Sequence, residues 1–251
     1  MSERPEGGVI VVGASSGIGA AIAVEYARRG RRVALIARRG ERLAEVAARC
    51  DAAAGKPVAI WRAHDVREHD EIPELFRSLD AELGGLDTFV YAAGVMARIG
   101  PDEFDFEKDR TVLEVCLEGA VAWLDQAATA FLARGRGRIC GISSIAGERG
   151  RRAYPSYHAA KAGLTTFLES LRNRLVVRGI HVTTIKPGFV DTDMTKGMDG
   201  LFWVKSPEAA ARTIVRHVER GAGTRYVPAR WALVALAIRS IPSFIFRRLD
   251  I

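Results

Sequence analysis

Short apolar runs alternate along the chain with longer segments that have helical spacing. "GVIVVG", "RVALIA", "LDTFVYAAG", "GRICGISS" and "HVTTIKPG" have the length of strands, and several of them end at glycine. "AAIAVEYARRG" and "ERLAEVAARCDAAAG" carry apolar residues at helical intervals and also stop at glycine. Apolar strands separated by helix-length segments indicate βαβ units and a parallel sheet. The pattern therefore predicts an α/β fold: a single-domain, doubly wound (Rossmann-type) parallel sheet with helices on both faces.

The pattern changes near the end of the chain. We expect residues 1–228 to form the α/β domain, and residues 229–251 to form a C-terminal apolar extension with arginines at its margins. The apolar run from Trp231 to Ile238 is too short to cross a bilayer, which needs about 20 residues. One interpretation is a helix that lies in a membrane surface. The other is a segment that packs on its own subunit or across a dimer interface.

Composition and charge limit the class of protein. Hydrophobic residues make up 48% of the 251 residues, enough for a sizeable core, and the net charge is +7. Because the arginines are scattered along the chain, we first interpret the positive net charge as a general feature of the composition. Attraction to an anionic partner is the second interpretation. Without a zinc ligand set or a basic-aromatic platform, no nucleic-acid partner is predicted.

The cysteines and the N-terminal segment bear on localisation. Cys50, Cys116 and Cys140 show no CxxC spacing, and "MSERPEGG" has no apolar leader. We expect a cytoplasmic protein, at the inner face of the membrane if the extension binds lipid.

A glycine-rich turn follows the first predicted strand. "VVGASSGIGAAIA" places Gly13, Gly17 and Gly19 in the spacing GxxxGxG rather than the commoner GxGxxG. Glycines allow close backbone approach, and the start of the next helix offers free N–H groups to a phosphate. Ser15 and Ser16 add hydroxyl donors. The turn predicts a dinucleotide site, and the alternative is a strand-to-helix turn without a ligand.

The end of the second strand bears on the choice of dinucleotide. NAD-binding proteins usually carry an acid there, which binds the ribose 2′-hydroxyl. This chain has Ala37 followed by Arg38 and Arg39. Arginines bind a 2′-phosphate through charge-assisted hydrogen bonds. We therefore predict NADP(H), with NAD(H) and a merely solvated arginine pair as the alternatives.

The segment "YPSYHAAK" holds candidate acid–base chemistry. Tyr157 and Lys161 are four residues apart, so on a helix they share a face, whereas Tyr154 is two turns from the lysine. A neighbouring ammonium group lowers the pKa of a tyrosine, which can then exchange a proton with a carbonyl or alcohol oxygen. Upstream, Ser143 and Ser144 end a strand, where a serine can hydrogen-bond a developing alkoxide.

These motifs together resemble the short-chain dehydrogenase/reductase family. The matching elements are "GASSGIG", "HDV", "AAG", "SSIAG", "YHAAK" and "KPGFVDT", in an order that covers Gly8 to about Pro228. The resemblance implies oxidation or reduction of a carbonyl or secondary alcohol with NADP(H), and a homodimer or homotetramer. It implies a catalytic Tyr157 with Lys161 lowering its pKa and Ser144 as the catalytic serine. The implied cofactor-binding residues are Gly13, Ser15, Ser16, Gly17, Ile18, Gly19, Arg38, Arg39, Asp65, Val66, Ala92, Ala93, Gly94, Tyr157, Lys161, Pro187, Gly188, Val190 and Thr192.

Two positions depart from the family pattern. The family usually has "NNAG" after the fourth strand, and here Tyr91 and Ala92 replace both asparagines. Cys116 stands where the family often has an asparagine that supports a water chain to the lysine. A thiol is a weak hydrogen-bond partner, so the relay is expected to use a main-chain group or to be weaker. No histidine shows metal-ligand spacing with a carboxylate, and no metal is predicted.

The segment Asp193–Lys205 follows the last motif and is a mobile lid in the family. The lid is apolar, and its Met194, Met198 and Phe202 are candidate substrate contacts. Tyr154, outside the lid, is a further candidate. A hydrophobic or amphiphilic carbonyl compound is expected, unless the lid simply packs on the domain. The extension and "AGERGRR" also resemble one branch of the family, the reductases of polyprenyl-phosphate-linked 2-keto-pentoses, as in decaprenylphosphoryl-arabinose formation. A lipid-linked ketosugar is therefore one alternative, and a non-catalytic nucleotide-sensing scaffold is another.

Overall fold

A single parallel sheet organises the chain in the computed structural model, which describes residues 7–97, 99–100 and 102–249. The sheet has seven strands in the order β3-β2-β1-β4-β5-β6-β7, and every neighbouring pair is parallel. The strands are β1 (Gly8–Val12), β2 (Val33–Ala37), β3 (Ala59–Ala63), β4 (Leu86–Tyr91), β5 (Gly137–Ile142), β6 (Ile180–Pro187) and β7 (Thr224–Val227). The predicted doubly wound α/β fold is confirmed.

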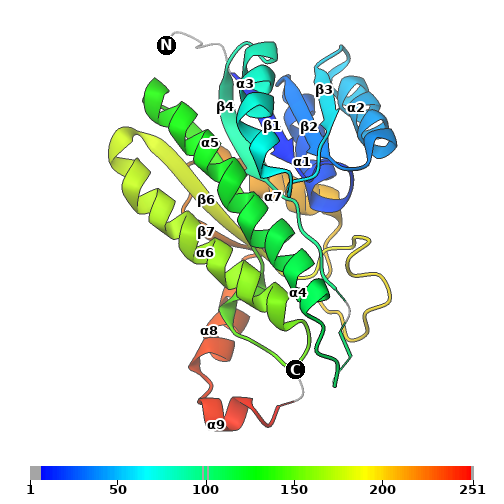
Figure 1. The fold of residues 1–251 in the computed structure, drawn as a ribbon, viewed down its shortest axis with the longest axis vertical. Helices are drawn as coiled ribbons and strands as arrows, with labels where there is room; N and C mark the ends of the chain where they lie inside the picture. The colour runs from blue at the N-terminus through cyan, green and yellow to red at the C-terminus, as the bar shows by residue number, and fades with distance from the viewer. Residues whose placement is uncertain (1–6, 98, 101, 250–251) are drawn as a thin grey trace.

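Helices cover both faces of the sheet (Figure 1). One face carries α1 (Gly17–Arg28), α2 (Gly40–Ala54) and α7 (Pro207–Glu219). The other carries α3 (Ile72–Glu82), α5 (Gly119–Arg134) and α6 (Pro155–Leu175), and α4 (Phe106–Leu113) packs on α6. Because strands such as β1 are buried on both faces, they are apolar at every position rather than at alternate ones.

The helix from α4 to α5 contains a π-helical turn, η2 (Glu114–Glu118). The Tyr91 hydroxyl donates to the main-chain oxygen of Val115 within this turn, at 2.6 Å. A π-helical turn inside an α-helix is often found at a functional site. The whole helix, Phe106–Arg134, is long and apolar enough to cross a bilayer, but half of its apolar window is buried in the domain, as in a core helix.

The C-terminal extension forms two short helices, α8 (Trp231–Ser240) and α9 (Ser243–Phe246), outside the sheet (Figure 1). Trp231 and Ala235 are buried against the domain, in a cluster with Ile145 and the half-buried Phe189 and Tyr226. Arg149 holds the far end of α8, because its guanidinium donates to the main-chain oxygens of Ile238 and Ile241. One face of the extension therefore packs on its own subunit, and its contact with a membrane or a second copy stays a prediction.

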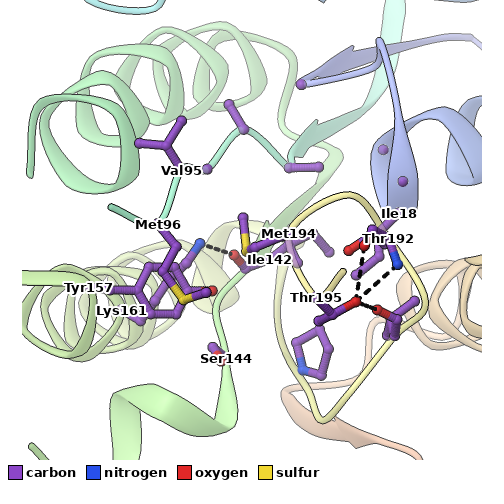
Figure 2. Close-up of a pocket in the computed structure, with 18 of the residues that line it drawn as sticks. Ile18, Val95, Met96, Ile142, Ser144, Tyr157, Lys161, Thr192, Met194 and Thr195 are labelled. Atoms are coloured by element: carbon purple, nitrogen blue, oxygen red, sulfur yellow. Dashed lines mark hydrogen bonds between the residues drawn. The ribbon is translucent and has the colours of Figure 1, made fainter. Parts of the chain in front are cut away.

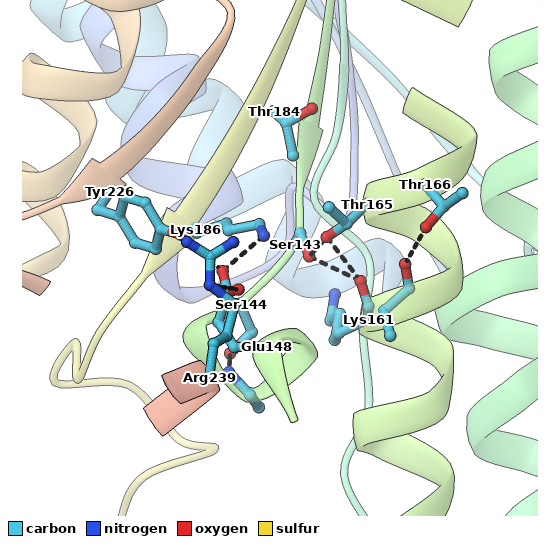
Figure 3. Close-up of polar contacts among 12 residues, drawn as sticks. Ser143, Ser144, Glu148, Lys161, Thr165, Thr166, Thr184, Lys186, Tyr226 and Arg239 are labelled. Atoms are coloured by element: carbon cyan, nitrogen blue, oxygen red, sulfur yellow. Dashed lines mark hydrogen bonds and ion pairs between the residues drawn. The ribbon is translucent and has the colours of Figure 1, made fainter. Parts of the chain in front are cut away.

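A buried ion pair connects this extension to the domain (Figure 3). The Glu148 carboxylate accepts hydrogen bonds from Lys186 Nζ at 2.6 Å and from the Tyr226 hydroxyl at 2.7 Å. Arg239 of α8 approaches the same carboxylate to 3.6 Å. The side chains of Glu148 and Lys186 are 3% and 7% exposed. The pair therefore fixes the turn after β5, the end of β6 and the extension to one another.

We expect Glu148→Ala to destabilise the protein by about 3–5 kcal/mol, because the substitution leaves the Lys186 ammonium buried without its carboxylate. Urea unfolding of the wild type and the variant measures this difference. The matched control is Glu74→Ala, which removes the exposed pair with Arg77 and should cost less than about 1 kcal/mol. Equal effects of the two substitutions would contradict the structural role of the buried pair.

Candidate active site

A cleft of about 750 Å³ lies where the strands β1 to β6 end. Its walls are the loops that follow these strands and the first turns of α1 and α6. All the predicted catalytic residues line it, and so do all the predicted cofactor residues except Asp65. The sequence motifs therefore come together at one edge of the sheet, as expected for a parallel α/β fold.

The glycine turn forms a cradle without side chains at the start of α1. A Cβ on Gly13, whose φ is +86°, would lie 2.3 Å from the Ala93 nitrogen, and one on Gly19 would lie 2.2 Å from the Gly13 oxygen. Ser16 is the N-cap of α1, yet its side chain accepts no hydrogen bond from the helix. The first N–H groups of a helix have no partner within it. The turn therefore fits a dinucleotide phosphate, with backbone donors and room for close approach.

Arg38 and Arg39 border the cleft beside this turn. Arg39 Nη2 donates to the hydroxyl oxygens of Ser15 and Ser16, at 2.8 and 2.9 Å. Arg38 lies 3.8 Å from the Asp65 carboxylate. Two guanidinium groups thus stand at the end of β2, where a 2′-phosphate on a bound dinucleotide would be recognised.

Asp65 is the one predicted cofactor residue that does not line the cleft, and its contact with a cofactor stays a prediction. Its carboxylate accepts from Arg67 Nη2 at 2.7 Å and lies outside the cleft lining, which instead includes His64 and Val66. The hydrogen bond from Arg67 is the main cause that lowers the pKa of Asp65. Asp65 therefore orders the loop after β3 through a neighbour that the motif "HDV" does not contain.

His64 belongs to a group that was not foreseen from the sequence. Its buried ring lies edge-on to Trp123, and its Nδ1 is 3.4 Å from Glu71 and 3.8 Å from Glu68. These ligand atoms all lie within 4.8 Å of one another, a spacing that could hold a metal ion. Both carboxylates are well exposed. Exposed carboxylates are common without a metal, so the prediction of no metal stays untested.

Tyr157 and Lys161 lie on the same face of α6 and point into the cleft (Figure 2). The helix starts at Pro155, and the residue before it, Tyr154, has a φ of +59° that few non-glycine residues adopt. The Lys161 Nζ lies 5.6 Å from the centre of the Tyr157 ring. It donates to the main-chain oxygen of Ile142, at 2.9 Å.

The two serines after β5 have different surroundings. The Ser143 hydroxyl donates to the Lys161 main-chain oxygen at 2.9 Å and lies 2.8 Å from the Thr165 hydroxyl (Figure 3). The Ser144 side chain acts on Tyr157 by lowering its pKa, and its hydroxyl accepts from the Ala146 nitrogen at 3.0 Å. Ser143 therefore fixes α6 to the sheet, and Ser144 is the serine beside the acid–base tyrosine.

The expected lowering of the Tyr157 pKa by Lys161 was wrong for the protein without nucleotide. Burial raises the pKa of Tyr157, the charge of Cys116 adds to this effect, and the hydrogen bond with Ser144 opposes it. Burial also lowers the pKa of Lys161. A lysine one helical turn away favours the phenolate, whereas burial disfavours it because the charged form loses its solvation. For Tyr157 the effect of burial is the larger of the two.

Cys116 lies in η2 and does not bond to the lysine. Its Sγ is 3.3 Å from both the nitrogen and the oxygen of Val95, so it ties the π-helical turn to the loop after β4. Tyr91 ties the same turn to the end of β4. Tyr91 and Cys116 therefore hold the segment around "AAG" against η2, while Lys161 uses the main-chain oxygen of Ile142.

The lid, Asp193–Lys205, contacts the cleft with some of its residues and the C-terminal extension with others. Met194 and Met198 line the cleft, as predicted, and Tyr154 borders both this cleft and a smaller neighbouring pocket. Phe202 does not line the cleft and stacks on Trp231 of the extension, with 5.0 Å between ring centres, so its contact with substrate stays a prediction. Thr195 stabilises the start of the lid by donating to the Val190 oxygen at 2.8 Å.

Several cleft residues carried no clear signal in the sequence. They are apolar or basic side chains of the loops after β4, β5 and β6, namely Val95, Met96, Ile142, Ile145, Arg151 and Phe189. Arg151 belongs to "AGERGRR", and its pKa is lowered by burial. Only its nearness to Tyr157 in the sequence could have indicated that it borders the site.

Comparisons with known proteins agree with this geometry. A family model described as short chain dehydrogenase matches residues 8–199. An uncharacterized oxidoreductase of Myxococcus xanthus is 39% identical over 199 residues, which cover 78% of this chain and 76% of that protein. The cis-4-hydroxycyclohexanecarboxylate dehydrogenase of Sinomonas cyclohexanicum is 35% identical over 190 residues, 75% of each chain. A variant actinorhodin polyketide ketoreductase with NADPH has a similar structure, with a TM-score of 0.81 and 27% identity over 90% of this chain and 97% of that one.

We expect Tyr157 to remain a neutral phenol in the nucleotide-free protein up to at least about pH 10, because burial disfavours the phenolate. The measurement is the ultraviolet absorbance of phenolate during a pH titration of the wild type, minus that of Tyr157→Phe. The difference should show no phenolate step below that pH. A step near neutral pH would contradict the raised pKa.

Proposed function

The chain belongs to the short-chain dehydrogenase/reductase family and is an NAD(P)-dependent oxidoreductase of carbonyl and CH–OH groups, and on this premise we propose that it reduces a hydrophobic or amphiphilic ketone with NADPH. The observation that supports this most is the meeting of Ser144, Tyr157 and Lys161 in the same cleft as the glycine turn. A protein that only senses nucleotide has no need of this acid–base group.

In this mechanism, the bound cofactor supplies the hydride that adds to the carbonyl carbon. The Tyr157 hydroxyl donates a proton to the carbonyl oxygen, and the Ser144 hydroxyl hydrogen-bonds the same oxygen as negative charge develops on it. The hydride and the proton together convert the ketone into a secondary alcohol. Burial keeps the proton on Tyr157 in the protein without nucleotide, so the side chain holds the proton that the reduction requires.

The preference for NADPH is supported by the two arginines at the end of β2. Both border the cleft beside the glycine turn, and Arg39 is already held by the serine hydroxyls of that turn. A 2′-phosphate carries negative charge that both guanidinium groups can bind. A carboxylate at the end of β2, which would repel that phosphate, is lacking because the strand ends at Ala37.

A second candidate function is the reduction of a polyprenyl-phosphate-linked 2-keto sugar. The apolar lid residues Met194 and Met198 and the exposed apolar side of the extension favour a substrate with a lipid part. Fold similarity alone does not decide between substrates. A screen of NADPH oxidation with lipid-linked ketosugars, steroids and small diketones separates the two candidates, since only one class should give a high kcat/KM.

Tyr157→Phe should lower kcat by about 10²- to 10⁴-fold with NADPH and a ketone, because the proton donor is lost. NADPH binding, followed by fluorescence titration, should change little. The matched control is Tyr154→Phe, which removes a hydroxyl from the same cleft and should keep activity of the same order. Full activity in Tyr157→Phe would show that the proposed mechanism is wrong.

Replacing both Arg38 and Arg39 by alanine should lower kcat/KM for NADPH by at least about tenfold, because charge-assisted hydrogen bonds to the 2′-phosphate are lost. The value for NADH, which lacks this phosphate, should change much less. Arg49→Ala, an exposed arginine on α2, is the control and should leave both values unchanged. A wild-type enzyme that clearly prefers NADH would contradict the assignment.

A further inference from the structure

Helix α8 is apolar on both faces, but the domain covers only one of them. Trp231 and Ala235 are buried on the inner face. Leu233 and Leu236, on the opposite side of the helix, are 72% and 55% exposed. A surface helix normally carries polar residues on its outer face, and a helix that is apolar all round is normally covered. The outer face of α8 therefore has the composition of a buried surface.

The exposed apolar side chains continue beyond α8. Phe244 and Ile245 of α9 are exposed, and so are Phe202, Trp203 and Val204 of the lid. The lid and α8 are in direct contact, since Phe202 and Trp203 lie 5.0 and 5.8 Å from Trp231 between ring centres. Together these residues form what we call the tail surface: Phe202, Trp203, Val204, Leu233, Leu236, Phe244 and Ile245. Groups of exposed large apolar side chains often mark a site of contact with a partner.

The helices α8 and α9 and their margins carry only positive charge. Arg230, Arg239, Arg247 and Arg248 are exposed there, and the sequence has no acidic residue between Glu219 and Asp250. The nearest acids are the exposed Asp199 of the lid and Glu148, which Arg239 approaches to 3.6 Å. The Arg230 guanidinium lies 4.3 Å from the centre of the Trp203 ring. A symmetric contact between two copies would bring these arginines toward one another, which is repulsive. Anionic lipid headgroups are the complementary partner.

We propose that the tail surface docks on the surface of an anionic bilayer, with α8 and α9 lying flat in the headgroup region. The inner face of α8 stays on the domain, because Trp231 fills the space beside Gly188, where a Cβ would lie 2.0 Å from the indole Nε1. Arg149 also holds the end of α8. The ten residues of α8 are too few to cross a bilayer, so the contact is peripheral. The lid that lines the cleft would then lie beside the membrane.

Sedimentation of the full chain with vesicles tests this proposal. The wild type should sediment with phosphatidylcholine vesicles that contain phosphatidylglycerol, and much less with phosphatidylcholine alone. Replacing Leu233 and Leu236 by serine should lower the partition coefficient at least about tenfold, because two apolar side chains no longer enter the membrane. Replacing Arg247 and Arg248 by glutamine should lower binding to the anionic vesicles by a similar factor and reduce its salt dependence.

Val177→Ser is the matched control, because Val177 is 79% exposed but precedes β6, at the opposite edge of the sheet from the cleft. Its vesicle binding should equal that of the wild type. The proposal would be overturned if the wild type did not sediment with anionic vesicles. It would also be overturned if the leucine variants bound these vesicles as tightly as the wild type does. So would a wild-type oligomer that the leucine substitutions dissociate without any vesicle binding, since the surface would then contact a second copy. NADPH oxidation with a soluble ketone, measured in parallel, should be unchanged in the leucine variants, so failure here is distinct from failure of the proposed reductase activity.

Discussion

The parallel arrangement of all the strands is the constraint on which the rest of the structure depends. It places the carboxyl ends of the strands β1 to β6 at one edge of the sheet, so that the six loops that follow them meet around one cleft. Among them, these loops contribute backbone donors, guanidinium groups, a serine and the wall beside the lid. Because the strands are buried on both faces, the register that aligns these loops is fixed by the core rather than by the loops themselves.

The C-terminal extension is part of the same arrangement. Glu148, four residues after Ser144, pairs with Lys186, which directly precedes Pro187 at the end of β6. Trp231 contacts Gly188 and the lid residue Phe202. The turn after β5, the loop after β6 and the lid therefore share one support, and that support also presents the tail surface. Movement of the extension would alter the wall of the cleft opposite Tyr157.

The sequence predicted those features that depend on local spacing, and it failed where tertiary partners decide. The i, i+4 spacing of Tyr157 and Lys161 places both on one face of α6, and the glycine positions predict the cradle, because helix and turn geometry are local. The environment of Tyr157 depends on burial by distant segments, so its raised pKa was not predicted. Phe202 and Asp65 likewise turn toward Trp231 and Arg67, and only the folded chain shows these contacts. The carboxylates beside His64 were missed for the same reason.

The central claim, that hydride passes from a nicotinamide to a carbonyl carbon while Tyr157 supplies the proton, is tested most directly by isotope transfer. The enzyme is incubated with a reducible ketone and NADPH that carries deuterium at the transferable position of the nicotinamide, and the alcohol is analysed by mass spectrometry and NMR. The account predicts deuterium at the carbinol carbon, and no label at that carbon when unlabelled NADPH is used in D₂O. Deuterium at the carbinol carbon from D₂O, or none from the labelled cofactor, would contradict it.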